Sequence, residues 1–286
     1  VGMACRFPGA PDLDAFWQLL VDGRDMIGEI PLERWDTAKS GGSKYAGILE
    51  RIDMFDPQFF EISPREARLI DPQQRLFLEV AWEAAEHAGI VIHGTNTGVF
   101  VGCTNADYFD RIKPFLTLDD YAAGLGNKNC IIPNRVSYVM NLRGPSVLVD
   151  TACSSSLVAL HTALQSLRRG DCAQALVGGV NVLLSPLYYL ALHRMGVQAR
   201  DGRCKAFDHR ADGFASGEGA GAVLLKPLTS ALADGDRVYA IVRGSAVNHD
   251  GRSAGLAAPN PAAHAELIES AYRDAAVSPD SVSYIE

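Results

Sequence analysis

The sequence has few cysteines and none of the cysteine spacings that form metal sites. Its six cysteines are scattered among 286 residues, without a Cys-x-x-Cys pair or a matching histidine spacing. Zinc binding and a disulfide scaffold are therefore disfavoured. The N-terminus also lacks the basic segment and apolar run of a signal peptide. Unpaired thiols without a targeting signal indicate a reducing compartment, and we expect a cytoplasmic protein.

The chain also has fewer basic than acidic residues. The chain carries 26 Lys and Arg residues against 34 Asp and Glu residues, which gives a net charge of −8 and a sequence pI of about 5.4. Sequence-independent binding of nucleic acid requires clustered positive charge that displaces counterions. We therefore expect no nucleic-acid partner. The phosphate-binding pattern Gly-x-x-x-x-Gly-Lys-Ser/Thr is absent as well.

Long uninterrupted hydrophobic runs are missing too. Residues 175–192 carry no charge and just reach the minimal length of a membrane span. However, Gly178-Gly179, Asn181 and Ser185-Pro186 interrupt the run, and its valines favour a buried strand that ends at a turn. We expect a strand here and no association with a membrane.

What remains is an alternation of β-branched apolar runs with amphipathic stretches. Such alternation predicts an α/β fold with layers of helices and strands. With 48% hydrophobic residues, the chain can bury a large core in one or two domains. The predicted strands are 99–101, 146–149, 176–184, 220–225 and 238–242, and the predicted helices are 14–20, 73–88, 155–168 and 262–275.

Cys153 lies where a predicted strand meets a predicted helix. The run Ser146-Val-Leu-Val149 reads as a short strand, and leucines then recur at three- and four-residue spacing from Leu157 until Gly170 ends the pattern. The thiol therefore lies at a helix N-terminus, where the helix dipole and unpaired N–H groups favour the nucleophilic thiolate. The residues alone leave two readings open, a packing cysteine and a nucleophile for acyl chemistry.

The three serines after Cys153 have two possible roles. Ser154, Ser155 and Ser156 can cap the first turn of the helix with their side-chain oxygens. They could also include the nucleophile of a serine hydrolase at a strand-turn-helix elbow. No Gly-x-Ser-x-Gly pattern surrounds them, so the hydrolase reading is disfavoured.

Other candidate motifs favour structural roles. The run Gly217-Glu-Gly-Ala-Gly221 leads into a predicted strand instead of a helix, so it indicates close backbone approach and not a phosphate loop. Asp208, His209 and Asp212 lack the donor spacing of a calcium loop and predict an Asp-stabilised turn. The isolated histidines His161, His249 and His264 receive no catalytic role.

The segment Asp150-Thr-Ala-Cys-Ser-Ser-Ser-Leu157 resembles the active-site signature of β-ketoacyl synthases, specifically the ketosynthase domains of modular type I polyketide synthases. Further blocks resemble the same family in the same order from one end of the chain to the other. These are Gly2-Met-Ala-Cys-Arg-Phe-Pro-Gly9, Asp71-Pro-Gln-Gln-Arg75, Asn134-Arg-Val-Ser-Tyr138, Phe207-Asp-His-Arg-Ala-Asp-Gly213, Gly217-Glu-Gly219 and Gly244-Ser-Ala-Val-Asn-His-Asp-Gly251.

The resemblance implies a thiolase-like layered αβαβα architecture and an acyltransferase. In this reading, Cys153 takes an acyl group from a phosphopantetheine thioester and then passes it to a malonyl-type extender in a decarboxylative condensation. The phosphopantetheine belongs to a partner acyl carrier protein, and this chain itself binds no cofactor or metal. The resemblance also implies a homodimer.

The resemblance divides the chain into two parts. Residues 1–235 are expected to form the N-terminal half, which carries the nucleophile, and residues 236–286 the beginning of the C-terminal half, with a linker near 229–236. Family members use two histidines, the first in a His-Gly-Thr-Gly-Thr block after a Tyr-Ile-Glu-like strand, and this chain stops at Tyr284-Ile-Glu286. We therefore expect a piece of a larger protein that condenses nothing by itself. The alternative is a non-elongating domain that holds acyl groups or scaffolds a dimer.

Overall fold

The computed structural model describes residues 1–40, 42–117, 119–120, 122–256 and 258–286. They divide into two compact units, residues 1–227 and residues 228–286. The first unit contains a five-stranded sheet of order β1-β7-β6-β4-β5 and a two-stranded sheet of β2 and β3. The strands are β1 (Gly2–Arg6), β2 (Gly28–Glu29), β3 (Tyr45–Ala46), β4 (Thr97–Gly102), β5 (Ser146–Val149), β6 (Gln174–Asn181) and β7 (Gly219–Leu225).

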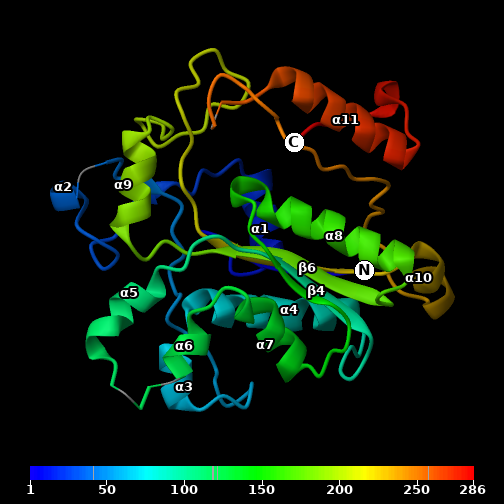
Figure 1. Cartoon of the computed structure of the whole chain (residues 1–286), viewed down its shortest axis with the longest axis horizontal. Coiled ribbons are helices and arrows are strands. Elements are labelled where there is room, and N and C mark those ends of the chain that lie inside the picture. Colours follow the sequence, from blue (N-terminus) through cyan, green and yellow to red (C-terminus); the bar gives the residue numbers. More distant parts are fainter. Residues whose placement is uncertain (41, 118, 121, 257) are drawn as a thin grey trace. The chain divides into compact units, whose positions relative to one another are not determined.

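Helices cover both faces of the large sheet. Figure 1 shows α8 on one face, and α4 and α7 on the other, so the first unit has three layers. The helices of this unit are α1 (Leu13–Val21), α2 (Thr37–Ser40), α3 (Pro64–Leu69), α4 (Pro72–Ala88), α5 (Tyr108–Ile112), α6 (Ala122–Gly126), α7 (Ile131–Val139), α8 (Ser155–Arg169) and α9 (Pro186–Arg194), with short 3-10 turns η1 (Lys113–Phe115) and η2 (Ala152–Ser154).

The sheet is parallel at its centre and antiparallel at one side. β4 pairs in parallel with β5 and with β6, whereas β7 is antiparallel to β6 and β1 is antiparallel to β7. Because the carboxyl ends of β4, β5 and β6 meet at one edge, the residues that follow these strands lie close together. This edge carries the candidate site.

α4 is the most buried helix and anchors the core. Asp71 caps its N-terminus by accepting a hydrogen bond from the N–H of Gln73, Pro72 begins the helix, and Gly89 ends it with a left-handed φ of 67°. Phe77 and Leu78 are completely buried in the cluster that α4 forms with β4, β6 and β7. The helix predicted over 73–88 is therefore confirmed, and most of its residues are buried.

Most predicted elements are confirmed within three residues at each boundary, and β5 coincides with the prediction. The uncharged run 175–192 forms β6, a turn and α9. Among the described residues, no helix is both long and apolar enough to cross a membrane.

The second unit differs in part from its sequence prediction. The segment 229–236, predicted as a linker, is mostly helical, because it contains most of α10 (Leu228–Asp234), in which Ala231 is buried. The predicted strand 238–242 is irregular, because a strand needs a hydrogen-bonded neighbour and the described residues supply none to this segment. The unit also contains α11 (Pro261–Ala275), capped by Asn260, and the 3-10 turn η3 (Pro279–Ser281).

Candidate active site

Cys153 lies in the 3-10 turn η2, between the end of β5 and the start of α8. The preceding residue, Ala152, has a φ of 55°, a left-handed conformation that is uncommon for a residue with a side chain. This sharp reversal leaves Cys153 exposed at the head of a 15-residue helix. The strand-turn-helix placement predicted for the thiol is therefore confirmed.

The serines stabilise the turn in a way that differs from the prediction. Ser154 is the N-cap residue of α8, but its side chain makes no capping bond and instead donates to the carbonyl oxygen of Thr151 at 2.9 Å. The hydroxyl of Ser155 accepts from the N–H of Thr151 at 2.9 Å and donates to the carbonyl oxygen of Ala152 at 2.6 Å. Each hydroxyl thus donates to the backbone carbonyl oxygen three residues earlier and so binds the turn.

A hollow of about 890 Å³ opens beside Cys153. It is built from the ends of β4 and β6, the start of β7, and side chains of α8 and α9. Its lining includes Cys103, Thr104, Asn105, Cys153, Leu160, Asn181, Leu183, Tyr188, Leu192, Phe214 and Glu218. The hollow is mostly apolar with a few polar groups, which suits the binding of an acyl chain.

Two asparagines form a polar bridge across this lining. The side-chain amide of Asn105 donates to Oδ1 of Asn181 at 2.8 Å, and the amide of Asn181 donates to the carbonyl oxygen of Gly217 at 2.6 Å. The bridge connects the segment after β4 with the end of β6 and the segment before β7. Sequence reasoning missed it, because these residues are far apart along the chain.

Asp150 connects the turn around Cys153 to the same wall. Its Oδ1 accepts from the hydroxyl of Thr104 at 2.9 Å and from the N–H of Ala152 at 3.3 Å. Within the part of the chain that the structure describes, the N–H of Cys153 has no protein acceptor. This N–H is therefore available to a negatively charged oxygen that develops next to the thiol.

Glu218 is a functional-site residue that the sequence did not single out. It lines the hollow, and its buried carboxylate forms an ion pair with Arg34 at 3.0 Å. Backbone N–H groups of Leu49 and Leu183 each donate to it at 2.8 Å. Burial raises the pKa of Glu218, while the Arg34 charge and the two N–H donors oppose that effect.

Of the glycines in the run 217–221, Gly219 shows the predicted close approach, whereas a Cβ on Gly217 or Gly221 would make only ordinary contacts. A Cβ at Gly219 would lie 2.8 Å from the ring of Phe7. The run continues into β7, so it forms no phosphate loop at a helix N-terminus.

A second thiol lines the hollow but differs from Cys153 in its surroundings. Cys103 is buried, and burial raises its pKa to about 12, with smaller contributions in the same direction from Asp71 and Asp150. Cys103 therefore remains a thiol at neutral pH. Of these two cysteines, only Cys153 is exposed to a substrate.

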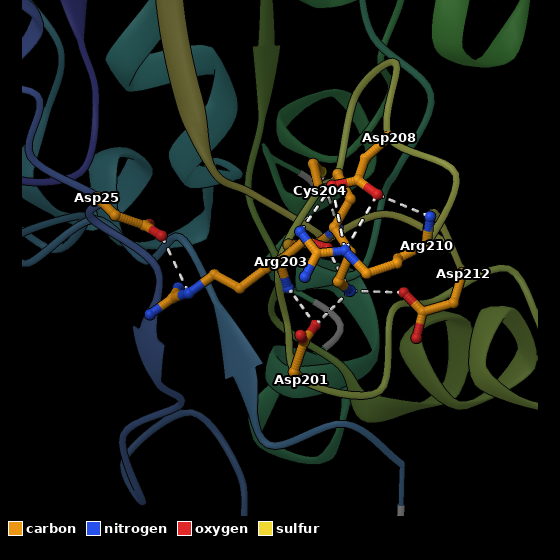
Figure 2. A network of polar contacts seen from close by, with 9 residues as sticks. Asp25, Asp201, Arg203, Cys204, Asp208, Arg210 and Asp212 are labelled. Atoms are coloured by element: carbon orange, nitrogen blue, oxygen red, sulfur yellow. Dashed lines mark hydrogen bonds and ion pairs between the residues drawn. The ribbon is translucent and has the colours of Figure 1, made fainter.

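The segment from Asp201 to Asp212 forms a network of ion pairs (Figure 2). Lys205 donates to Asp201 at 2.8 Å and to Asp212 at 2.6 Å, and Arg203 pairs with Asp25 at 3.0 Å. Asp208 accepts from the N–H of Arg210 at 2.8 Å, which confirms the Asp-stabilised turn. No group of three or more metal-ligating side chains occurs in the described residues.

The three histidines considered from the sequence lie in different surroundings. His161 is on α8 in the first unit. His249 and His264 belong to the second unit, where His249 accepts from the N–H of Gly251 at 2.9 Å and His264 lies 3.4 Å from Asp250.

Comparisons with known proteins agree with this geometry. Residues 1–231 match the family described as "Beta-ketoacyl synthase, N-terminal domain", and residues 239–286 match "Beta-ketoacyl synthase, C-terminal domain". The chain belongs to the β-ketoacyl synthase family. The family resemblance of the sequence blocks is thus confirmed.

Relatives of this ketoacyl synthase chain are parts of polyketide synthases. It is 50% identical to a phenolphthiocerol/phthiocerol polyketide synthase protein of Mycobacterium tuberculosis, with 100% of this chain and 16% of that protein covered. It is 45% identical to "Polyketide synthase PksN" of Bacillus subtilis, with 100% of this chain and 5% of that protein covered. The chain thus spans a small part of the length of these relatives.

Solved ketosynthases have the same fold. The ketosynthase from module 6 of the bacillaene synthase of Bacillus subtilis superposes with a TM-score of 0.94 at 41% identity, covering 100% of this chain and 50% of that one. The oxazolomycin ketosynthase domain OzmH KS7 of Streptomyces albus gives a TM-score of 0.92 at 42% identity, covering 100% and 53%. The predicted thiolase-like α/β fold is confirmed.

Proposed function

We propose that this ketoacyl synthase chain belongs to a polyketide synthase in which Cys153 carries the growing acyl group. The observation that supports this proposal most directly is the exposed thiol at the head of α8, open to an apolar hollow. The serines nearby are engaged with the turn backbone, which makes them weaker candidates for the nucleophile.

The first step is a thioester exchange. The thiolate of Cys153 attacks the carbonyl carbon of an acyl-phosphopantetheine thioester, and a new C–S bond forms as the bond to the pantetheine sulfur breaks. The pantetheine sulfur leaves and takes up the proton that Cys153 released. The N–H of Cys153 can donate to the oxyanion of the tetrahedral intermediate.

The second step is a decarboxylative condensation. A malonyl-type thioester loses carbon dioxide, and the resulting enolate carbon attacks the acyl carbonyl on Cys153. A carbon–carbon bond forms, and the thiolate of Cys153 leaves and is regenerated. We propose that both thioesters are presented by an acyl carrier protein, which supplies the phosphopantetheine.

A homodimer in the cytoplasm is part of the same proposal. β5 is an edge strand of the large sheet, and the unpaired backbone groups of an edge strand can bind a second copy of the chain. Six cysteines, all unpaired in the structure, support a reducing compartment.

The experiment that tests the nucleophile is acylation followed by mass spectrometry. The purified protein is incubated with butanoyl-pantetheine, and the adduct is measured in the wild type, in Cys153→Ala and in the control Cys130→Ala, which removes an exposed thiol outside the hollow. We expect an adduct of one butanoyl group in the wild type and the control, and none in Cys153→Ala. A full adduct on Cys153→Ala would refute the site.

Condensation is tested separately from acylation. After acylation of the whole synthase in which this chain is proposed to lie, malonyl-loaded carrier protein is added and the carrier-bound product is measured. Acylation with elongation supports a condensing ketosynthase, whereas acylation by the intact parent protein without elongation supports an acyl-holding domain. Labelling of Ser154, Ser155 or Ser156 by a fluorophosphonate would instead support a serine hydrolase.

A further inference from the structure

Gln73 is a buried polar residue for which the proposed chemistry gives no role. It is the second residue of α4, and only 1% of it is exposed. It does not line the hollow beside Cys153. A buried side-chain amide must have its donor and acceptor satisfied, because an unmade bond costs about 1 to 3 kcal/mol.

The amide of Gln73 binds two segments that do line the hollow. Its Nε2 donates to the carbonyl oxygen of Asn105 at 2.8 Å, and its Oε1 accepts from the N–H of Val182 at 3.1 Å. The thiol of Cys103 also donates to Oε1, at 3.6 Å. One side chain thus connects α4 with the segment after β4 and with the end of β6.

These two segments also meet directly, at the bridge between Asn105 and Asn181. Asn105 follows β4, and Asn181 is the last residue of β6, one position before Val182. Gln73 therefore holds both ends of this bridge from the opposite face of the sheet. Glutamine suits the position because it supplies a donor and an acceptor on one planar group.

We propose that Gln73 is a positioning residue for the acylation of Cys153. It fixes the segments 103–105 and 181–183 so that the hollow accepts the acyl group in a reactive orientation, although it does not touch that group. The inference rests on the proposed function of Cys153. A small displacement of a positioned group is enough to lower the rate of a reaction strongly.

The neighbouring residue Gln74 provides a matched control. Gln74 is also 1% exposed on α4. Its Nε2 donates to the carbonyl oxygen of Gly126 at 2.9 Å, and its Oε1 accepts from Nε of Arg135 at 2.9 Å. Neither of these partners lines the hollow. Replacing Gln74 therefore removes an equally buried amide without releasing the wall beside Cys153.

The test compares Gln73→Met with Gln74→Met in the purified protein. The second-order rate constant for acylation by butanoyl-pantetheine is measured at equal folded fraction, together with alkylation of Cys153 by iodoacetamide, a small reagent that does not need the hollow. We expect Gln73→Met to acylate at least about tenfold more slowly than Gln74→Met. Alkylation should be equal in the two variants. Equal acylation by both variants, or a parallel loss of alkylation in Gln73→Met, would overturn the proposal.

A second variant keeps the proposal testable if Gln73→Met does not fold. In Gln73→Glu, the carboxylate can accept from Val182, but it can donate to Asn105 only when protonated. The acylation rate of this variant relative to the wild type should therefore rise as the pH falls. A ratio that is independent of pH would contradict the positioning role.

The wild type separates the two proposals. If it gives no adduct on Cys153, the proposed function fails. If it acylates normally and Gln73→Met acylates as fast as Gln74→Met, only the role of Gln73 fails.

Discussion

The carboxylate of Glu218 and the guanidinium of Arg34 form an ion pair at 3.0 Å, with side-chain exposures of 0% and 8%. The pair joins residues 184 positions apart, and its carboxylate partner Glu218 lines the Cys153 hollow. Two backbone N–H groups complete the bonding of the carboxylate. These partners compensate the burial of the Glu218 carboxylate, which would otherwise destabilise the folded protein.

Glu218→Gln should therefore destabilise the protein. The amide cannot neutralise the buried Arg34, so we expect the free energy of unfolding to fall by about 3 kcal/mol. Urea denaturation measures this difference. The control is Asp171→Asn, which breaks a 2.7 Å ion pair with Arg169 on the surface and should cost less than about 1 kcal/mol. Equal losses of unfolding free energy in the two variants would show that burial does not make the ion pair of Arg34 and Glu218 more costly to break than a surface pair.

The raised pKa of Glu79 on α4 makes the stability of the protein depend on pH. Burial raises its pKa to about 7, the Glu83 charge adds to this, and Arg6 and Arg75 oppose it. The folded state thus binds the Glu79 proton more tightly than the unfolded state. The stabilisation from Glu79 is complete below the ordinary pKa of glutamate and is lost as the pH rises through about 7.

Glu79→Gln should remove this contribution. Between about pH 4.5 and 8, the wild type should lose about 2 kcal/mol more unfolding free energy than the variant. Denaturation curves at a series of pH values measure the difference, with Glu86→Gln on the exposed side of the same helix as the control. Parallel pH profiles of the wild type and Glu79→Gln would contradict the prediction.

The six cysteines should separate into two classes of reactivity. Cys130, Cys153 and Cys204 are exposed, whereas Cys5, Cys103 and Cys172 are buried. Burial raises the pKa of each of the three buried thiols, which lowers their thiolate fraction further. At about pH 8 we expect iodoacetamide to modify the three exposed thiols in the folded protein and all six only after unfolding. Peptide mapping identifies the sites, and early modification of Cys103 would disprove its burial.

The strand-turn-helix position of Cys153 could be predicted from the sequence because its signals are local. The apolar run of β5 ends at Val149, and the leucine spacing of α8 begins at Leu157. Neighbours in the chain therefore define the turn around Cys153. The left-handed φ of Ala152 has no such signal, because alanine does not favour this conformation.

The supporting residues could not be predicted, because their partners are distant. Gln73 binds Asn105 and Val182, which are 32 and 109 positions away. The alternation of apolar and polar residues likewise did not predict β1, because its five residues become a strand by pairing with β7 at the other end of the first unit. The segment 238–242 shows the opposite case, in which an apolar pattern without a neighbouring strand stays irregular.

Gly178 lies on β6 next to β7 and lines the hollow, and its surroundings leave no room for a Cβ. A Cβ on Gly178 would lie 2.0 Å from the carbonyl oxygen of Gly221 and 2.8 Å from the ring of Phe77. Neither group can move easily, because the first is strand backbone and the second is completely buried. Gly178→Ala should therefore lower the free energy of unfolding by about 3 kcal/mol through overpacking.

Gly124 is the matched control for this substitution. It lies in α6, and a Cβ there would meet nothing within 4 Å. Gly124→Ala should be neutral or raise the free energy of unfolding by up to about 1 kcal/mol, because alanine favours the helix. Urea denaturation of both variants measures the contrast. If Gly178→Ala were as stable as Gly124→Ala, the lack of room for a Cβ at Gly178 would be disproved. The side chains around this part of the hollow would then pack differently from the structure.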